Sequence, residues 1–339
     1  MKKKILLVIR YIFFLGLGIL LAWIPVHNIT PAKWAEIKIA LGQARYFLLL
    51  PIIILYLLSH WSRAVRWKIM IGPLGYRPAT LNVFFAVMIG YLVNLALPRL
   101  GEVVKCSILG RHEKIPIDQL LGTIIVERVF DLLCLAGVFA LAFALQAKDI
   151  NDYALAQTRA GTSGWSRHWL LFLVLGLLGT VAVLFTVYRK FKTHRVIRWI
   201  EDLLLGMWGG ISRVRHMKNK GWFLFHTVFI WSLYFICTRL GLYALKDLDN
   251  LGAKETLSVL GVGSIGMIVT QGGLGAYPLL VQHTLMFYHI PDVIALAAGN
   301  VLWVVPTLMI ILVGLLSFFA LTLTGRSGTL VKNGKTPEV

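Results

Sequence analysis

The amino-acid sequence predicts an all-α polytopic membrane protein with about six full transmembrane helices and two re-entrant helical hairpins in an inverted-topology repeat. Composition is the first reason: of 339 residues, 58% are hydrophobic and only 14% are charged, whereas soluble proteins carry about 25% charged residues. The second reason is that the apolar residues form runs of membrane-spanning length. The third is a pair of glycine-containing breaks that recur at a fixed spacing.

Six apolar segments are predicted to cross the bilayer. A helix rises about 1.5 Å per residue, so crossing about 30 Å of hydrocarbon takes roughly 20 apolar residues. The segments are 5–25, 46–62, 118–145, 169–188, 221–245 and 292–323. The first resembles a secretory signal but lacks a small-x-small cleavage site, which indicates an uncleaved span. We therefore expect one integral-membrane domain over residues 1–325 and a disordered cytoplasmic tail over residues 326–339.

Two further apolar regions, 80–97 and 257–288, contain internal breaks. The first break lies in N-L-A-L-P-R-L-G-E and the second in I-V-T-Q-G-G-L-G-A. They align without gaps at an offset of 174 residues, so that Leu100 falls on Leu274 and Pro98 falls on Gly272. Matches at a single offset indicate a duplicated unit, with repeats around 80–145 and 257–323. The residues expected to shape the hairpins are Pro98, Gly101, Gly272, Gly273 and Gly275.

Charge assigns the topology. If 80–97 enters the bilayer and returns, the basic residues on both sides of it stay on the inner face, as the positive-inside rule requires. These residues are Arg63, Arg66, Lys68 and Arg77 before it, and Arg99, Lys105, Arg111 and Lys114 after it. Three crossings between the hairpins then turn the second one upside down. Both termini become cytoplasmic, and the expected location is the plasma membrane, the inner membrane of a bacterium.

The interior of the 118–145 span, beyond Asp118 at its start, carries three charged residues, Glu127, Arg128 and Asp131. Arg128 lies ten residues beyond Asp118, so roughly 15 Å into the bilayer. A charge at that depth costs about 2.5–3.5 kcal/mol on insertion scales and should be paired and face protein or water. Two interpretations stay open: a site that holds a lipid phosphate or relays protons, and a structural ion network.

Polar residues near the two breaks are further candidates for substrate binding. Arg99, Glu102 and Lys105 flank the first break, where exposed backbone N–H groups and cations suit a phosphate. Gln271 and Tyr277 offer neutral hydrogen bonds at the second. Arg239, roughly 9 Å from the outer end of its span, is either an outer phosphate contact or a side chain that reaches the interface.

Other patterns indicate structure and not chemistry. Residues 146–167 have the composition of an outer loop, and residues 195–210 that of an amphipathic helix on the inner leaflet. The G-x-G-x-x-G match at 261–266 indicates close helix packing, because no βαβ unit surrounds it. The histidines lack metal-ligand spacing, so no metal or cofactor is expected. The net charge of +19 is spread over segments between apolar runs, which favours contact with anionic lipid over nucleic acid.

Three motifs together carry a resemblance to a known family. They are A-L-P-R-L-G-E at 96–102, V-E-R-V-F-D at 126–131 and G-G-L-G at 272–275. In order and spacing they resemble the flippase-like transmembrane domain of the lysylphosphatidylglycerol synthases and its stand-alone relatives, over roughly Tyr46 to Leu323. The resemblance implies lipid movement between leaflets. Because the sequence ends at Val339 without a soluble synthase domain, we expect no lysyltransferase activity.

The expected function is therefore translocation of a phospholipid or other phosphate-bearing lipid through a polar cavity at the hairpins. The expected partners are membrane lipids with an anionic or phosphate-bearing headgroup, and a second copy of the chain or a lipid-synthesis enzyme. One alternative is an intramembrane lipid-modifying enzyme with Glu127 or Asp131 as general base. Another is a membrane partner of a separate lipid synthase.

Overall fold

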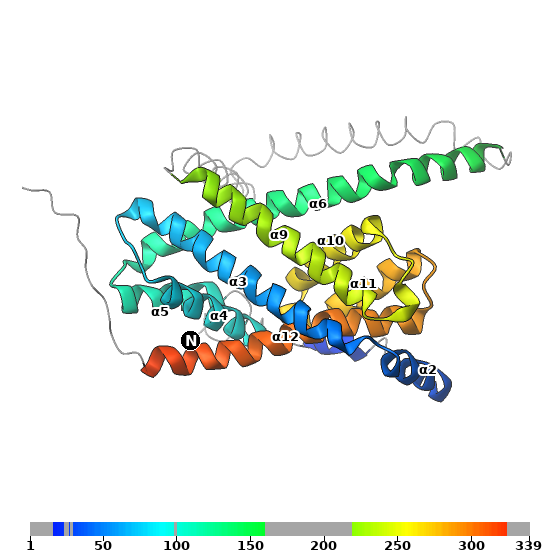
Figure 1. Ribbon diagram of the computed structural model, residues 1–339, viewed down its shortest axis with the longest axis horizontal. Helices are drawn as coiled ribbons and strands as arrows, with labels where there is room; N and C mark the ends of the chain where they lie inside the picture. The colour runs from blue at the N-terminus through cyan, green and yellow to red at the C-terminus, as the bar shows by residue number, and fades with distance from the viewer. Residues whose placement is uncertain (1–15, 24–26, 28–29, 98–99, 160–218, 324–339) are drawn as a thin grey trace, which may run out of the picture. The chain divides into compact units, whose positions relative to one another are not determined.

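The computed structural model describes residues 16–23, 27, 30–97, 100–159 and 219–323. Within these ranges the chain forms helices and turns and no strand, as the all-α prediction requires. Two compact units are distinguished, residues 1–139 with 217–339, and residues 140–216. The helices of the first unit are α2 (Pro31–Gly42), α3 (Leu49–Ile71), α4 (Thr80–Ala96), α5 (Leu100–Glu113), α9 (Lys220–Tyr243), α10 (Ala253–Val269), α11 (Ala276–Phe287), α12 (Asp292–Leu323) and the first part of α6 (Ile117–Arg159) (Figure 1).

Four of the described helical segments are long and apolar enough to cross a membrane. They are Tyr46–Leu74, Ile117–Gln146, Lys220–Tyr243 and Asp292–Leu323. The last three confirm the spans predicted over 118–145, 221–245 and 292–323. Each predicted bound lies within two residues of the bound of the corresponding segment. Most of 5–25, and all of 169–188, 195–210 and 326–339, lie outside the described residues.

Two predicted boundaries are wrong. The span predicted over 46–62 continues in α3 to Ile71, because no proline or glycine occurs between residue 62 and Gly72. The loop predicted over 146–167 is helical at its start, since α6 continues to Arg159. Helix α2 was not predicted, although Thr30 followed by Pro31 at its first position is a helix-start signal.

α4 and α5 form the first hairpin. The chain leaves α4 at Leu97 in an extended conformation (φ −136°, ψ 109°), the conformation that a following proline favours. The Oδ1 atom of Asn94 accepts a hydrogen bond of 2.8 Å from the backbone N–H of Gly101, which satisfies an unpaired donor in the first turn of α5. Gly101 permits the close approach, because a Cβ there would lie 2.0 Å from the carbonyl oxygen of Gly90.

α10, the short 3-10 helix η4 (Gln271–Gly273) and α11 form the second hairpin. Gly272, Gly273 and Gly275 all have positive φ angles, of 59°, 75° and 71°, which only glycine adopts without strain. The indole N–H of Trp303, on α12, donates to the carbonyl of Gly272 at 2.8 Å. The prediction that these glycines shape the turn is confirmed.

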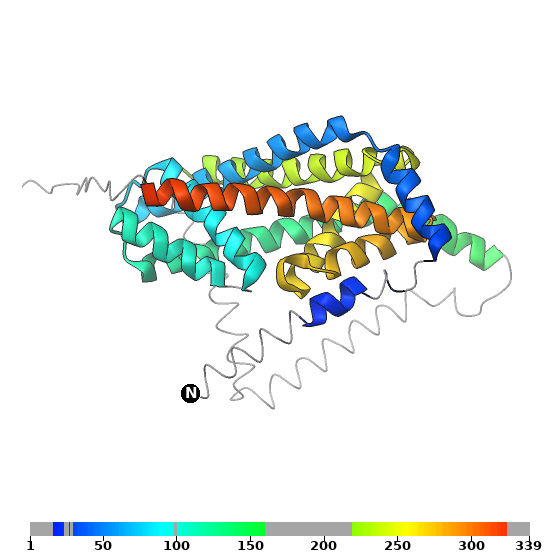
Figure 2. The same cartoon turned by 90° about the horizontal axis from the view of Figure 1, so that it is seen from below.

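The tips of the two hairpins meet. The Gln271 side-chain amide donates to the carbonyl oxygen of Leu95, at the end of α4, over 3.3 Å. A Cβ on Gly272 would lie 2.7 Å from Leu95 Cδ2. Helix α12 packs against both hairpins, against α11 along its first half and α4 along its second half (Figure 2).

α3 and α9 lie side by side and antiparallel (Figure 1). Just before α3, the backbone N–H of Arg45 donates to the carbonyl of Ala244 at the end of α9 (2.8 Å). Near the other end of α3, Arg66 reaches Thr227 in the first half of α9 (3.4 Å). The helices that precede the two hairpins therefore run in opposite directions.

The offset of 174 residues also describes the helix boundaries. Added to the bounds of α4, 80–96, it gives 254–270, and α10 spans 253–269. Added to those of α5, 100–113, it gives 274–287, and α11 spans 276–287. The 3-10 helix η2 (Gly72–Leu74) gives 246–248, the bounds of η3 (Lys246–Leu248). The correspondence thus begins before the hairpins and includes α3 and α9.

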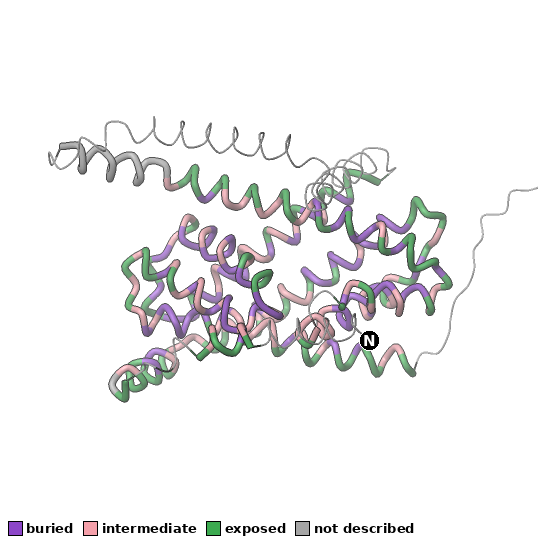
Figure 3. Tube along the Cα trace, turned by 180° about the vertical axis from the view of Figure 1, so that it is seen from behind, coloured by how far each residue is buried: buried purple, intermediate pink, exposed green. Residues whose placement is uncertain are grey.

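Within α3, burial is concentrated in the half that carries the charged side chains. In α3 the buried residues, apart from Ile52, all fall between Ser59 and Ile71. The second half of α12, in contrast, is mostly exposed (Figure 3). The second half of α3 therefore holds its polar residues between neighbouring helices, and a polar site lies there.

Candidate functional site

Helix α3 supplies two buried arginines to this site, Arg63 and Arg66. The side chain of Arg66 is fully buried and that of Arg63 is 9% exposed. The pair lies one turn apart on a face that also carries Ser59 and Ser62. Arg63 donates to the Tyr234 hydroxyl (3.3 Å) and Arg66 to the Thr227 hydroxyl (3.4 Å), both on α9.

Helix α6 supplies the matching carboxylates, Glu127 and Asp131, which are also one turn apart. Arg63 Nη1 lies 2.7 Å from Glu127 Oε1 and 2.7 Å from Asp131 Oδ2. Arg66 Nη2 lies 2.9 Å from Asp131 Oδ1 and 3.4 Å from Glu127 Oε1. Each carboxylate therefore bridges both arginines, and α3 is tied to α6 at this level.

The first hairpin contributes the third cation, Lys105 on α5. Its Nζ atom lies 3.0 Å from Glu127 Oε2 and 4.6 Å from the centre of the Trp67 ring, a cation–π contact. The Trp67 indole N–H donates to the Thr123 hydroxyl at 2.8 Å. Thus α5 is joined to the same carboxylate that holds the arginines of α3.

The ion cluster, defined as Arg63, Arg66, Lys105, Glu127 and Asp131, holds three formal positive charges and two negative ones. Removing one partner of a buried ion pair typically costs about 3–5 kcal/mol, because the other charge is left uncompensated. An excess cation in such a place is stable only beside further acceptors or an anion. The cluster therefore favours an additional negative charge.

Several nitrogen atoms at the cluster have no hydrogen-bond partner among the described residues. They are Nε of Arg63, Nε of Arg66 and both ring nitrogens of His60. His60 is 5% exposed, and its ring lies 4.9 Å from that of Tyr91. Guanidinium groups bind phosphate and carboxylate oxygens through two neighbouring N–H groups. The arrangement can accept such an anion.

Arg128 forms a separate ion pair with Glu102 on the first hairpin. The prediction that Arg128 is paired is confirmed. Its side chain is nevertheless 58% exposed, against 17% for Glu102, because it points away from the cluster side of α6. The first hairpin is thus attached to α6 by two ion pairs, one buried and one at an exposed arginine.

The other predicted site residues serve different contacts. Gln271 bonds to Leu95 at the hairpin tips, and Arg239 donates to the carbonyl oxygen of Leu251. The ring of Tyr277 fills the space over Gly263, so the close packing predicted for the glycines of 261–266 is confirmed. Pro98 and Arg99 lie outside the described residues.

The sequence analysis placed Arg63 and Arg66 on the inner face, beyond the span 46–62, and did not connect them with Glu127 and Asp131. Both lie inside α3 and complete the cluster. The available signal was the spacing of Ser59, Arg63 and Arg66, which share one helix face. Within the described ranges, no group of three or more His, Cys, Asp or Glu could hold a metal ion.

The long apolar helices, with charged side chains buried between them, define an integral membrane protein. The chain belongs to the family of the lysylphosphatidylglycerol synthase TM region, whose model matches residues 6–314. The resemblance inferred from its motifs is thereby confirmed.

Two curated relatives match part of the chain. It is 32% identical over 133 residues to the UPF0104 membrane protein MJ1595 of Methanocaldococcus jannaschii, covering 38% of this chain and 36% of that protein. It is 31% identical over 134 residues to the glycosyltransferase AglD of Haloferax volcanii, covering 39% of this chain and 22% of that protein. The matches therefore span about a third or less of each relative. No solved structure is significantly similar.

Proposed function

We propose that the protein moves a phospholipid or other phosphate-bearing lipid between the leaflets of the plasma membrane, through a polar path beside the two hairpins. The observation that carries the proposal is the excess positive charge of the buried ion cluster, three cations against two carboxylates. A lipid phosphate would compensate that charge, while the acyl chains stay in the bilayer.

Lys105 is the residue on which translocation depends most. It is held by one carboxylate oxygen, Glu127 Oε2 at 3.0 Å, whereas Glu127 keeps its bond to Arg63 if Lys105 leaves. A phosphate entering beside Arg63 and Arg66 competes with Glu127 for Lys105. The exchange would release α5 from α6 at that point, so headgroup binding and movement of the first hairpin would be coupled.

The antiparallel arrangement of α3 and α9, with hairpins that meet at their tips, supports an inverted repeat. In transporters built this way, discontinuous helices approach the bilayer midplane from opposite faces. The proposed topology has the open ends of the two hairpins on opposite sides of the membrane and both termini in the cytoplasm.

This topology is tested by single cysteines at exposed positions near the open ends of the hairpins, Arg111→Cys and Phe287→Cys, in a chain without its native cysteines. An impermeant maleimide should label the two from opposite sides of the membrane. Labelling of both from the same side rejects the inverted arrangement.

The function is tested by the accessibility of lipid headgroups in vesicles containing the purified protein. Fluorescent phosphatidylglycerol in the inner leaflet should become reducible by dithionite faster than in protein-free vesicles. Lys105→Gln should lower that rate about tenfold if the lost contact contributes roughly 1.4 kcal/mol. The control Lys38→Gln, at an exposed position of α2, should leave it unchanged. Equal rates with and without protein, for anionic, zwitterionic and glycosylated phospholipids alike, reject translocation.

A second candidate function is action on a lipid that carries a sugar, and it rests on the similarity to the relative named as a glycosyltransferase. In this case the protein would serve a separate enzyme of lipid synthesis, as substrate carrier or as membrane partner. Translocation of glycosylated phosphate lipids but not of phosphatidylglycerol would favour it. We propose no catalytic step for the chain itself.

A further inference from the structure

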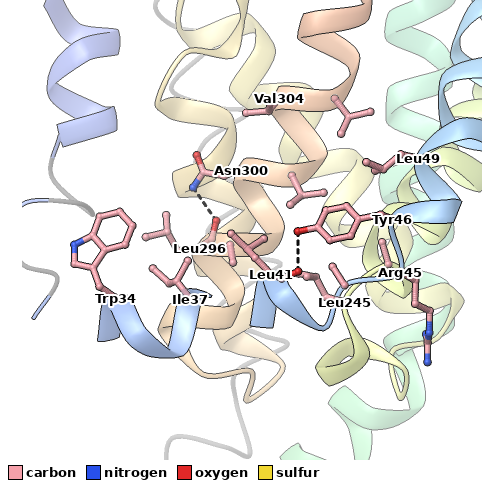
Figure 4. A pocket seen from close by; sticks show the side chains of 15 residues that line it. Trp34, Ile37, Leu41, Arg45, Tyr46, Leu49, Leu245, Leu296, Asn300 and Val304 are labelled. Atoms are coloured by element: carbon pink, nitrogen blue, oxygen red, sulfur yellow. Dashed lines mark hydrogen bonds between the residues drawn. The ribbon is translucent and has the colours of Figure 1, made fainter. Parts of the chain in front are cut away.

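An apolar chamber of about 440 Å³ lies at the end of the α3–α9 pair opposite the ion cluster (Figure 4). Its walls come from α2, the start of α3, the turn that follows α9 and one face of α12. One residue from each wall is, in the same order, Leu41, Leu49, Leu245 and Val301. Its volume falls within the range of small-molecule sites.

Two polar side chains of the chamber, Asn300 and Tyr46, donate to backbone carbonyls. The Asn300 amide donates to the carbonyl of Leu296 (2.9 Å), and the Tyr46 hydroxyl donates to that of Leu41 (2.7 Å) (Figure 4). With these groups satisfied, the chamber presents carbon atoms to its contents. An apolar occupant therefore loses no hydrogen bond on entering.

Arg45, at the rim, is also engaged and points away from the chamber (Figure 4). Its guanidinium makes two bonds of 2.6 Å to the Asp249 carboxylate and one of 2.8 Å to the carbonyl of Tyr243. The bond from Arg45 holds the pKa of Asp249 below its usual value. A charged headgroup would have to displace this bidentate pair, so the chamber does not suit one.

The chamber occupies the position in the second repeat that the ion cluster occupies in the first. Three chamber residues of α12, taken back by the offset of 174, fall on three residues at the cluster on α6. Ala297, Val301 and Val305 correspond to Thr123, Glu127 and Asp131.

The walls next to these helices correspond as well. Leu49, at the start of α3, matches Phe223 at the start of α9, whose ring lies 6.0 Å from the Arg66 guanidinium. Leu245, just past α9, matches Ile71 at the end of α3. One backbone arrangement thus occurs twice, once lined by charges and once by aliphatic side chains.

We propose that this chamber binds a hydrocarbon chain of a membrane lipid, and that the two equivalent sites have diverged, one for a headgroup and one for a chain. The segments Tyr46–Leu74 and Asp292–Leu323, which both contribute lining residues, have membrane-spanning length and composition, so acyl chains are the abundant apolar ligand around them. Because an acyl chain in the bilayer is already out of water, van der Waals packing against the chamber walls would hold it. The inference rests on the proposed function only in taking a membrane lipid as the ligand.

The test is photo-labelling of the full chain in vesicles containing a trace of phosphatidylglycerol with a diazirine near the end of one acyl chain. After irradiation and digestion, mass spectrometry compares labelling of chamber residues with that of Leu308 and Leu312, which are 60% and 61% exposed on the same helix. Val301→Phe, which fills the chamber, should lower chamber labelling to the level at Leu308 and Leu312, because the ring takes the space of the chain. Leu308→Phe is the matched control and should not change it.

Val304→Phe is a second filling variant at a position that is 37% exposed, where a larger ring is accommodated if Val301→Phe does not fold. Chamber labelling that stays unchanged in the folded filling variants overturns the proposal. Chamber labelling that persists in Lys105→Gln, while headgroup translocation is lost, supports the chain site independently of the headgroup site. Intact chamber labelling in an unsubstituted protein that moves lipid headgroups no faster than protein-free vesicles rejects the proposed function and leaves the chain site standing.

Discussion

The two hairpins have nearly the same backbone plan and are fastened in different ways. The first is joined to α6 by the ion pairs Lys105–Glu127 and Arg128–Glu102. The second is joined to α12 by close backbone contact, since a Cβ on Gly299 would lie 2.6 Å from the carbonyl oxygen of Pro278. Helix α11 has no Lys, Arg, Asp or Glu, and α12 has only Asp292, so an equivalent pair of carboxylate and lysine or arginine cannot form there.

The difference separates an exchangeable attachment from a fixed one. A carboxylate that holds a lysine can be replaced by another anion at little net cost, because one charge-assisted bond substitutes for another. Close packing of backbone on backbone has no such substitute. We therefore expect an anionic ligand to loosen the first hairpin and to leave the second in place. The following predictions test that contrast, beginning with the largest effect.

Glu127→Gln should destabilise the protein most, by about 3–5 kcal/mol, because three buried cations would be left with one carboxylate. Glu127 contacts Arg63, Arg66 and Lys105. The measurement is the free energy of unfolding by SDS in mixed micelles. Glu36→Gln, at an exposed position of α2, is the matched control and should be neutral. A loss below about 1 kcal/mol, the range of surface pairs, would contradict the cluster as described.

Gly101→Ala and Gly266→Ala should each destabilise the protein by about 1–3 kcal/mol through overpacking. The new methyl group would lie 2.0 Å from the carbonyl oxygen of Gly90 in the first case and 2.7 Å from Cα of Tyr277 in the second. Thermal unfolding in detergent measures both. Gly137→Ala, with nothing within 4 Å of the new Cβ, should be neutral or stabilising. If Gly101→Ala alone is tolerated, the first hairpin is more loosely closed than described.

The sequence predicted the hairpins because their signals are local. Pro98 and Gly272 interrupt apolar runs that are too short to cross the bilayer, and the common offset needs no tertiary contact. It was also predictable that Glu127 and Arg128 would each have a partner of opposite charge, since a charge in an apolar span requires one. These features depend on what the bilayer demands of any chain.

The partners themselves were not predictable in this way. Arg63 lies 64 residues before Glu127, and an arginine after an apolar run looks the same whether it faces headgroups or enters a cluster. The chamber gave no signal either, because Val301 and Val305 would suit a lipid-facing position equally well. Only the packing of α3, α9 and α12 distinguishes a valine that lines the chamber from one that faces lipid.

Reactivity of the native cysteines should reveal whether the first hairpin opens while the α3–α9 pair stays closed. Cys106, beside Lys105, is fully buried, and Cys237 on α9 is 1% exposed. In a Cys134→Ser background, Lys105→Gln should raise the rate of maleimide reaction at Cys106 about tenfold, equivalent to roughly 1.4 kcal/mol less closing free energy. The rate at Cys237 should stay unchanged.

Anionic lipid should act in the same direction as that substitution. With Lys105 intact, exchanging phosphatidylcholine for phosphatidylglycerol should also speed the reaction of Cys106 and not that of Cys237. Parallel increases at both cysteines would mean general loosening of the protein, and would remove the distinction between an exchangeable hairpin and a fixed one.

The smallest expected effect concerns the Arg45–Asp249 pair at the rim of the apolar chamber. The hydrogen bond from Arg45 lowers the pKa of Asp249 in the folded protein, so the pair stabilises the fold fully above the ordinary aspartate pKa of about 3.9. That contribution is lost as the pH falls through the lowered value, and the melting temperature should decline there. Asp249→Asn should lower the melting temperature slightly at pH 7 and remove this part of the acid dependence. Because the pair is exposed to solvent, the difference between the two proteins should shrink at high salt; a difference independent of both pH and salt would show that Asp249 acts through packing and not through its charge.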